Sequence, residues 1–229
     1  MRLGVLGGTF DPIHAGHIAA AAAAERALAL GRVLLLPSRL PPHRPESARV
    51  SPRHRLAMAA LAAAEHPNWS ASDIELDRDG PSYTFDTLSG LVAGGHDRSQ
   101  IFFIIGADAF AEIATWSRYP AVLDLAHFAV VARPGITLDS LEKRVPDLAD
   151  RMTTPDALKP QAPSLKAREK TRVILIEATT PDVSATEIRR RVHDGESIAG
   201  LVPDSVAAYI ARHRLYVGTN LPPSPEASA

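Results

Sequence analysis

The feature that most constrains the fold of this sequence is a regular alternation of short apolar runs with segments of helical spacing. The apolar run Leu3–Leu6 is closed by two glycines, and an alanine-rich helical segment then extends from Gly16 to Leu30. A second apolar run, Val33–Leu36, follows and ends at a proline. Strand, glycine turn, helix and strand form a βαβ unit, in which the two strands are parallel and buried.

The same alternation continues along the rest of the chain. We predict further strands at Ser70–Leu76, Ile101–Ile105, Phe128–Ala132 and Val173–Ile176. We predict further helices at Ser51–Glu65, Phe85–Val92 and Leu138–Val145, a helical turn at Ala107–Ala114, and two more helices near the C-terminus. The pattern therefore predicts an α/β fold: a doubly wound, Rossmann-like parallel sheet with helices on both faces and a small C-terminal helical segment.

The 229 residues are expected to form one domain over residues 1–217. Within it, the stretch Pro146–Lys170 is rich in proline and charge and has neither helical nor strand periodicity, so we expect a surface excursion. Residues 218–229 are rich in Pro, Ser and Ala, and we expect a disordered tail.

Composition excludes several classes of function. The chain has no cysteine, which rules out disulfides, thiolate zinc sites and a cysteine nucleophile. Its formal net charge is -1, from 25 basic and 26 acidic residues, so we expect no nucleic-acid partner. The apolar segments are too short or too interrupted to span a bilayer, and the N-terminus lacks a signal-peptide pattern. We therefore expect a cytoplasmic protein without a membrane partner.

Polar and glycine residues gather where the predicted strands end, which is where doubly wound sheets bind ligands. The densest segment, residues 7–17, reads GGTFDPIHAGH and joins the first strand to the first helix. Glycines allow a backbone to approach a polyphosphate, and the N–H groups of a helix start attract anions. A glycine turn with two capping histidines explains a lone His pair, but it explains the complete string less well.

Two other readings of this segment have little support. His14 and His17 lack an evident third ligand, so we predict no metal site formed by the protein. A serine hydrolase would need a G-x-S-x-G elbow, which the surroundings of Ser184 do not provide.

A second segment, Ser184–Arg189, is open to two interpretations. Ser184 followed by Glu187 has the spacing of a capping box at a helix start. Arg189 on the first turns of that helix is poorly placed for the helix dipole but well placed beside a bound polyanion. Taken alone, the segment is equally a helix cap and a phosphate clamp.

His14, Gly16 and His17 match the H-x-G-H signature of the nucleotidyltransferase superfamily. The longer string GGTFDPIH resembles the bacterial nicotinate-nucleotide adenylyltransferases, and the resemblance runs from about Met1 to Tyr216. It is carried further by PPHR at residues 41–44, GPSYT at 80–84, IIGADA at 104–109, Trp116, RPG at 133–135 and VSATEIR at 183–189.

This resemblance implies transfer of AMP from ATP to nicotinate mononucleotide, giving nicotinate adenine dinucleotide and pyrophosphate in NAD biosynthesis. It implies catalytic roles for His14, His17 and Arg189, and Mg²⁺ accompanying ATP. The residues expected at ATP are Gly7, Gly8, Thr9, Phe10, Gly16, Ile105, Gly106, Asp108, Ser184 and Thr186. Those expected at the mononucleotide are Thr84, Trp116, Arg44 and Arg133.

Two alternatives remain at this stage. One keeps the chemistry and changes the acceptor to phosphopantetheine or a phospho-alcohol, with adenylyl or cytidylyl transfer. The other is a non-catalytic nucleotide-binding module, against which the complete set of His14, His17 and Arg189 argues. The sequence gives no prediction of oligomeric state.

Overall fold

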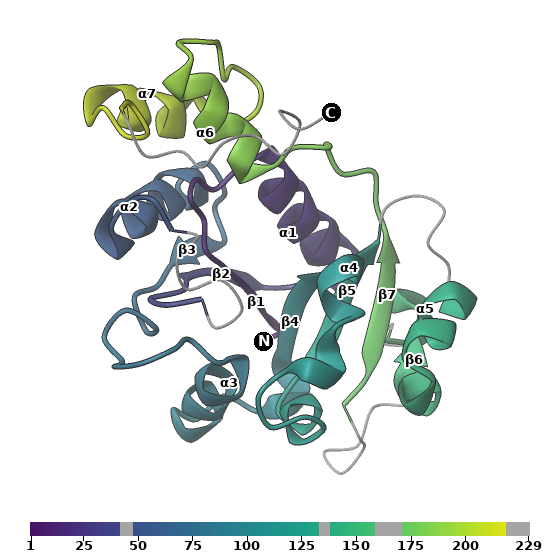
Figure 1. Ribbon diagram of the computed structural model, residues 1–229. Helices are drawn as coiled ribbons and strands as arrows, with labels where there is room; N and C mark the ends of the chain where they lie inside the picture. Colours follow the sequence, from purple (N-terminus) through teal and green to yellow (C-terminus); the bar gives the residue numbers. More distant parts are fainter. Residues whose placement is uncertain (42–47, 133–137, 159–170, 219–229) are drawn as a thin grey trace.

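The computed structural model describes residues 1–41, 48–132, 138–158 and 171–218. In that part of the chain, seven strands form one parallel sheet in the order β3-β2-β1-β4-β5-β7-β6 (Figure 1). The strands are β1 (Leu3–Gly8), β2 (Arg32–Pro37), β3 (Trp69–Ala71), β4 (Ile101–Gly106), β5 (His127–Ala132), β6 (Met152–Thr153) and β7 (Val173–Glu177).

Helices connect most of these strands and extend the chain beyond the last one. They are α1 (Ala15–Leu28), α2 (Pro52–Ala63), α3 (Thr84–Ala93), α4 (Ala107–Phe110), α5 (Leu138–Arg144), α6 (Ala185–His193) and α7 (Asp204–Arg212). Short 3₁₀ turns are η1 (Arg98–Gln100), η2 (Ile113–Thr115), η3 (Ala121–Asp124), η4 (Pro146–Arg151) and η5 (Pro155–Leu158).

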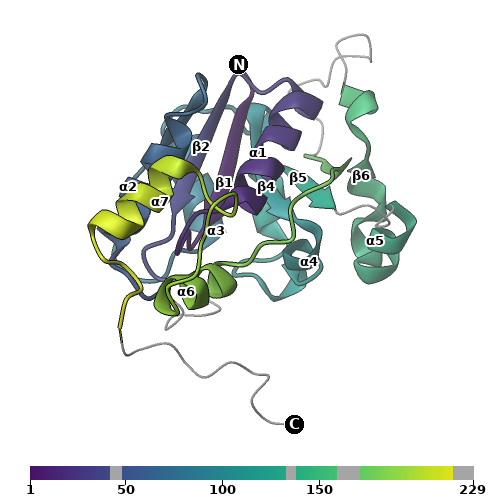
Figure 2. The ribbon, with the colours of Figure 1, turned by 90° about the horizontal axis from the view of Figure 1, so that it is seen from above.

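Each central strand is apolar on both sides because both faces of the sheet are covered. In β4, Phe102 and Ile104 join the core beneath α1 and α2, whereas Ile101, Phe103 and Ile105 join the core beneath α3. Figures 1 and 2 show these helices on opposite sides of the sheet. The continuous apolar runs in the sequence are thus the signature of strands buried on two faces, as predicted.

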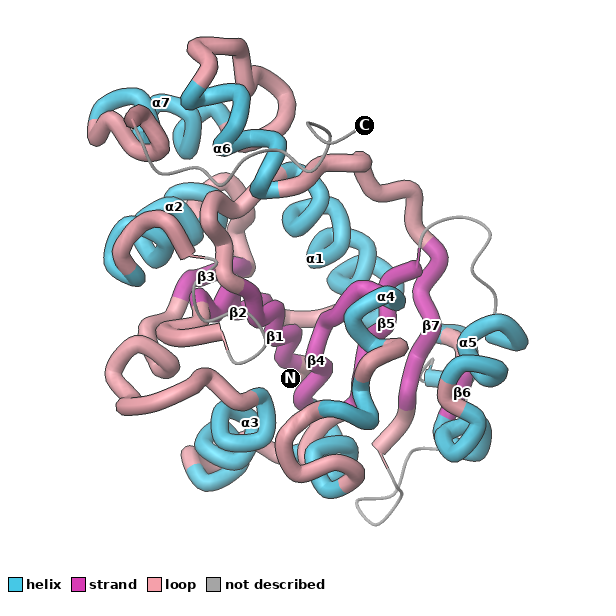
Figure 3. The backbone as a smooth tube through the Cα atoms, in the orientation of Figure 1, coloured by secondary structure: helices cyan, strands magenta, loops and turns pink. Residues whose placement is uncertain are grey.

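The strands β1 and β4 pair with each other. The chain leads from β1 to β2 on one side of this pair and from β4 to β5 on the other, so the strand order reverses between β1 and β4. In such sheets the crevice outside the carboxyl ends at this reversal is the usual ligand site. Figure 3 shows the loop after β7 crossing this edge of the sheet to reach α6 and α7. The predicted doubly wound fold with a C-terminal helical segment is confirmed.

Two predicted segments differ from the structure. The strand expected at Ser70–Leu76 ends at Ala71, because Asp73 starts a turn in which its carbonyl accepts from the N–H groups of Leu76 and Asp77. Part of the stretch Pro146–Lys170, where we expected a surface excursion without helical or strand periodicity, has regular structure. There η4 contributes the buried Leu148, and β6 pairs with β7 at the edge of the sheet.

Residues 159–170 of that stretch, and the tail from residue 219 onward, lie outside the described residues. Among the helices of the described chain, none combines the length and apolarity needed to span a membrane.

Candidate active site

The loop between β1 and α1 is folded tightly around two of its glycines. A Cβ on Gly8 would lie 2.7 Å from the Phe10 ring, and one on Gly16 would lie 3.1 Å from His14 Nδ1. Phe10 itself has a positive φ of 50° and is 1% exposed. The glycines therefore let a buried aromatic ring and an imidazole pack directly against the loop backbone.

His14 and His17 form one unit at the start of α1. The backbone N–H of His14 donates to His17 Nδ1 over 3.3 Å, and the two imidazole rings stack with centroids 3.7 Å apart. The Phe10 ring meets His17 edge-on at 5.1 Å. Because Nδ1 of neutral His17 accepts a hydrogen bond, its proton is on Nε2, which is left as a donor.

Burial keeps both imidazoles neutral. It lowers the pKa of His14 to about 4. The pKa of His17 falls well below its ordinary value because the ring is buried and because it lies beside His14. At neutral pH the pair therefore offers hydrogen-bond donors without carrying positive charge.

Arg189 reaches this loop from α6. Its Nη1 donates to the carbonyl oxygen of Asp11 over 2.7 Å, and its Nη2 donates to Thr186 Oγ1 over 3.1 Å. Burial lowers the pKa of Arg189, although the carboxylate of Asp11 opposes that effect. Arg189 Nε is buried without a hydrogen-bond partner among the described residues, as is His14 Nδ1. Buried polar atoms of this kind normally have a partner, and beside the β1–α1 loop a bound ligand can supply one.

The start of α6 shows that the two interpretations of Ser184–Arg189 are compatible. Ser184 Oγ accepts from the backbone N–H of Glu187 over 3.2 Å and so caps the helix. The cap fixes the first turns of α6, from which Arg189 extends toward the β1–α1 loop.

Two pockets open at the carboxyl edge of the sheet. The α1 compartment lies between the start of α1, the end of β4 and the loop after β7. Its lining includes His14, Gly16, His17, Ile105, Gly106, Asp108, Thr180 and Val183. It combines exposed backbone, the imidazole pair and one carboxylate, that of Asp108.

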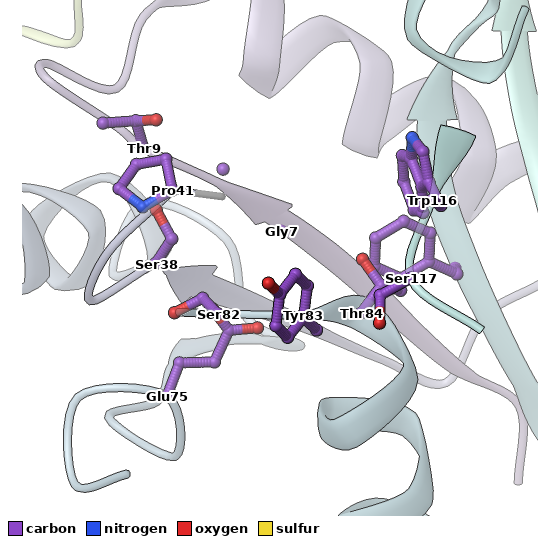
Figure 4. Close-up of a pocket in the computed structure, with 12 residues that line it drawn as sticks. Gly7, Thr9, Ser38, Pro41, Glu75, Ser82, Tyr83, Thr84, Trp116 and Ser117 are labelled. Carbon is purple, nitrogen blue, oxygen red and sulfur yellow. The ribbon is translucent and has the colours of Figure 1, made fainter. Parts of the chain in front are cut away.

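The α3 compartment lies between the β1–α1 loop and the start of α3, and is drawn in Figure 4. Its lining includes Gly8, Thr9, Ser38, Glu75, Ser82, Tyr83, Thr84, Trp116 and Ser117. Figure 4 shows Trp116, Ser117 and Thr84 at one end, with Glu75, Ser82 and Ser38 toward the other. One end thus offers an aromatic face and the other a group of polar side chains.

The two compartments meet at three shared residues: Gly7, Phe103 and Trp116 line both. Trp116 is half-buried, and its ring meets Phe103 edge-on at 6.0 Å. It is therefore a wall between two pockets, not the core plug that a loop Trp usually is. The arrangement can hold two ligands whose reacting ends meet beside Gly7 and the imidazole pair.

The structure brings most of the predicted site residues together, with some redistribution. Gly8 and Thr9, which we expected beside ATP, line the α3 compartment, whereas Gly7 lines both. Phe10 lines neither compartment, because its ring is buried against Gly8 and His17. The hydroxyls of Ser184 and Thr186 are engaged with the α6 cap and with Arg189. Arg44 and Arg133 lie outside the described residues.

Sequence reasoning missed Arg55, which holds the loops of the site in place. Its side chain is fully buried and donates to the carbonyl oxygens of Thr9 (2.8 Å), Ser38 (2.5 Å) and Arg39 (3.2 Å). The signal was its position on the apolar face of α2, one helical turn before Met58 and Ala59. A charged residue on such a face requires buried partners.

Glu75 was also missed. The residue is 7% exposed, and its carboxylate accepts from Thr87 Oγ1 over 2.7 Å. Burial raises the pKa of Glu75, while the hydroxyl groups of Thr87 and Ser82 oppose the rise. No sequence pattern indicated this burial, because Glu75 lies in a segment that we predicted as a strand.

The geometry agrees with comparisons to known proteins. The sequence profile of the cytidylyltransferase-like family matches residues 5–191. A probable nicotinate-nucleotide adenylyltransferase of Desulfatibacillum aliphaticivorans is 40% identical over 222 residues, covering 95% of this chain and 100% of the relative. One from Roseiflexus sp. (strain RS-1) is 43% identical over 216 residues, covering 93% and 97%.

The fold is shared with more distant solved structures. The Plasmodium falciparum nicotinic acid mononucleotide adenylyltransferase complexed with NaAD superposes with a TM-score of 0.70 at 16% identity, covering 94% of this chain and 97% of that one. With identity of 40% or more to curated relatives over nearly its whole length, the chain belongs to the nicotinate-nucleotide adenylyltransferase family of cytidylyltransferase-like enzymes.

Proposed function

We propose that this protein transfers AMP from ATP to the 5′-phosphate of nicotinate mononucleotide, forming nicotinate adenine dinucleotide and pyrophosphate. The observation that carries the proposal is the pair of compartments that meet at Gly7, Phe103 and Trp116 beside the imidazole pair. ATP occupies the α1 compartment, and the pyridine nucleotide occupies the α3 compartment with its ring against Trp116.

The reaction needs no protein nucleophile. An ionised oxygen of the acceptor phosphate forms a bond to the α-phosphorus of ATP, while the bond from that phosphorus to the α,β-bridging oxygen breaks. The electron pair of the broken bond leaves with pyrophosphate. The task of the protein is to align two anions in line and to stabilise the charge that develops between them.

The polar groups of the site suit that task. His17 donates a hydrogen bond from Nε2. Because the imidazoles are neutral, they do not attract the acceptor phosphate as positively charged rings would. Arg189 supplies a fixed positive charge beside the polyphosphate, and its unpartnered Nε is a further donor. Thr84 and Ser117 hold the pyridine end of the mononucleotide.

ATP-using enzymes of this kind employ a divalent ion, and the residues present fit one carried by the nucleotide. No cluster of three His, Asp or Glu side chains able to hold a metal occurs within the described ranges. Asp108 is an exposed carboxylate on the lining of the α1 compartment, and magnesium usually keeps several waters while bound by one or two carboxylates and phosphates. Mg²⁺ bound with ATP would neutralise its β and γ oxygens, with Asp108 contacting the hydrated ion.

The proposal is tested by incubating the purified protein with ATP, Mg²⁺ and one acceptor at a time, and following pyrophosphate release. The acceptors are nicotinate mononucleotide, nicotinamide mononucleotide and phosphopantetheine. We expect at least about a 10-fold higher kcat/KM with the nicotinate form than with the amide, because backbone N–H groups after Trp116 pair with a carboxylate better than with an NH₂ group. The guanidinium of Arg118, two residues after Trp116, lies over the Phe85 ring at 5.0 Å, so we expect its charge to contribute little to this preference.

Faster use of the amide would contradict the acceptor assignment and leave adenylyl transfer intact. Turnover only with phosphopantetheine, or ATP binding without turnover, would contradict the proposed function.

A further inference from the structure

The segment that follows α7 reaches back into the site through Tyr216. This residue lies outside residues 5–191, the part matched by the family profile. Its hydroxyl donates to Asp11 Oδ1 over 2.7 Å, a contact between residues 205 positions apart. The preceding residue, Leu215, is 7% exposed and belongs to the core beneath α1 and α2. The segment after α7 is therefore anchored in the core and contacts the β1–α1 loop.

Asp11 is the point at which this segment meets the proposed phosphate site. The residue is 2% exposed, and its other carboxylate oxygen, Oδ2, accepts from the backbone N–H of Arg49 over 2.5 Å. Both carboxylate oxygens thus have a donor. The backbone carbonyl of the same residue accepts from Arg189 Nη1.

Two buried guanidinium groups, those of Arg55 and Arg189, interact electrostatically with the Asp11 carboxylate. Burial lowers the pKa of each arginine, and the negative charge of Asp11 opposes that decrease. Neither guanidinium forms an ion pair with Asp11 in the structure. Arg55 is occupied by loop carbonyls, and Arg189 donates to a carbonyl and a hydroxyl.

The backbone on both sides of the contact is held in an unusual conformation. Phe10, next to Asp11, has a φ of 50°, and Tyr216 has a φ of 63°. Residues with side chains of this size adopt left-handed backbone angles only where the surrounding structure holds them there. The backbone on both sides of the Asp11–Tyr216 contact is therefore fixed by its surroundings.

From this arrangement we propose that Tyr216 is a positioning residue for Arg189. By donating to Asp11, its hydroxyl prevents the buried carboxylate from drawing the Arg189 guanidinium into an ion pair, and so leaves that group directed at the phosphates of ATP. The inference rests on the proposed function, in which Arg189 binds the polyphosphate. Without the hydroxyl, Asp11 Oδ1 becomes a buried unpaired acceptor. Arg55 and Arg189 each have a buried Nε without a partner among the described residues, but the Arg55 guanidinium is held by three loop carbonyls, which leaves Arg189 as the cation free to turn toward Asp11.

The test compares Tyr216→Phe with Tyr209→Phe. Tyr209 lies on α7, and its hydroxyl forms a hydrogen bond with His54 Nδ1 over 2.9 Å. The Tyr209→Phe variant therefore also removes one tyrosine hydroxyl contact from the C-terminal part of the chain, but one that does not involve Asp11. We expect Tyr216→Phe to lower kcat/KM for ATP by about 10-fold with the mononucleotide KM within about twofold of wild type. Tyr209→Phe should leave both constants unchanged.

A suppressor variant separates positioning from a merely structural role. Asp11→Asn removes the charge that would capture Arg189, so the double variant Asp11→Asn/Tyr216→Phe should regain most of the ATP affinity lost in Tyr216→Phe. A structural role predicts the opposite, an additive loss. Calorimetric titration with a non-hydrolysable ATP analogue gives the same comparison without turnover, so it remains informative if nicotinate mononucleotide is not the acceptor.

The inference is overturned if Tyr216→Phe binds the analogue as wild type does, if both tyrosine variants lose affinity equally, or if the double variant binds more weakly than either single variant. Absence of pyrophosphate release by the wild-type protein, with the analogue titrations behaving as expected, would overturn the proposed function alone.

Discussion

Single residues in this site work through the environment that fixes their protonation state. The imidazoles of His14 and His17 stack at 3.7 Å in a buried position, so a proton on either ring would repel a proton on the other. The lowered pKa values of both residues follow from that burial. The protein thus prepares neutral donors, which become more basic when an anionic polyphosphate arrives.

His17→Ala is expected to lower kcat/KM by an amount that corresponds to about 2 to 4 kcal/mol of lost transition-state stabilisation. This is the usual effect of removing one hydrogen-bond donor to developing charge. His17→Gln should recover part of that loss, because a Gln at this helix position can accept from His14 N–H and donate from its amide. Steady-state kinetics on these variants and on His96→Ala, an exposed control, check the prediction. Equal activity of His17→Ala and the control would remove His17 from the mechanism.

Trp116→Ala is expected to raise the KM for the mononucleotide about fivefold, since a stacked ring contributes about 1 kcal/mol. Because Trp116 lines both compartments, the KM for ATP should rise as well, but less. Trp116→Phe keeps an aromatic face and should lie closer to wild type. A larger effect on ATP than on the mononucleotide would reverse the assignment of the two compartments.

At the scale of elements, α2 connects the site to the body of the fold. Its apolar face packs on β2 and β3, and from the same face Arg55 binds the loops that follow β1 and β2. The Ser38 carbonyl, whose contact with Arg55 is buried, would otherwise lack this donor. The helix therefore fixes the relative position of two loops that both line the α3 compartment.

Arg55→Met is expected to lower the free energy of unfolding by about 2 to 4 kcal/mol, because hydrogen bonds from a charged donor to buried carbonyls are lost. Arg53→Met, on the exposed side of the same helix, should change it by less than about 0.5 kcal/mol. Urea denaturation of the two variants measures the difference. If both variants unfold at the same urea concentration, Arg55 has no structural role.

At the scale of the whole molecule, the two ends of the sheet have different tasks. The carboxyl edge carries the ligand compartments, whereas the amino edge is closed by buried contacts at the start of β5. There His127 is 2% exposed, accepts from the backbone N–H of Arg172 over 2.9 Å and stacks on Phe102. Burial lowers its pKa to about 4, and the charges of Arg2 and Arg172 act in the same direction.

This histidine makes stability dependent on pH. In the unfolded chain its pKa is the ordinary 6.5 and in the folded protein it is about 4, so the unfolded state takes up the proton first as the pH falls. Above about pH 6.5 its contribution is constant. Between that pH and about 4 it should cost the fold up to about 3 kcal/mol, with no further loss below.

The expected outcome is a steeper loss of unfolding free energy between pH 6.5 and 4 for wild type than for His127→Phe, measured by urea denaturation at a series of pH values. Other groups that titrate in this range contribute equally to the pH slopes of the two proteins, so their contributions cancel when the slopes are compared. Loss of the contact with the Arg172 N–H shifts the unfolding free energy of the variant by a constant amount and does not change its slope. Parallel curves would show that His127 is not the group responsible.

Local order in the sequence was enough to determine the architecture and the chemistry of the main loop. Buried parallel strands are encoded by consecutive apolar residues, and the GGTFDPIHAGH segment carries its glycines, helix start and imidazoles within eleven positions. The sequence could therefore predict the doubly wound sheet, the place of His14 and His17 at the start of the first helix and the capped start of α6.

Only the tertiary structure decided which contacts distant residues make at the site. Arg189 was expected there from the sequence, but its bond to the Asp11 carbonyl was not, and neither were the contacts of Tyr216 with Asp11 and of Arg55 with Thr9. These contacts span 46 to 205 positions. Glu75 became a pocket residue because Asp73 turned the chain after β3. Periodicity reports which side of an element is buried, but the partner of a buried polar group depends on how the elements pack, and no local pattern contains that information.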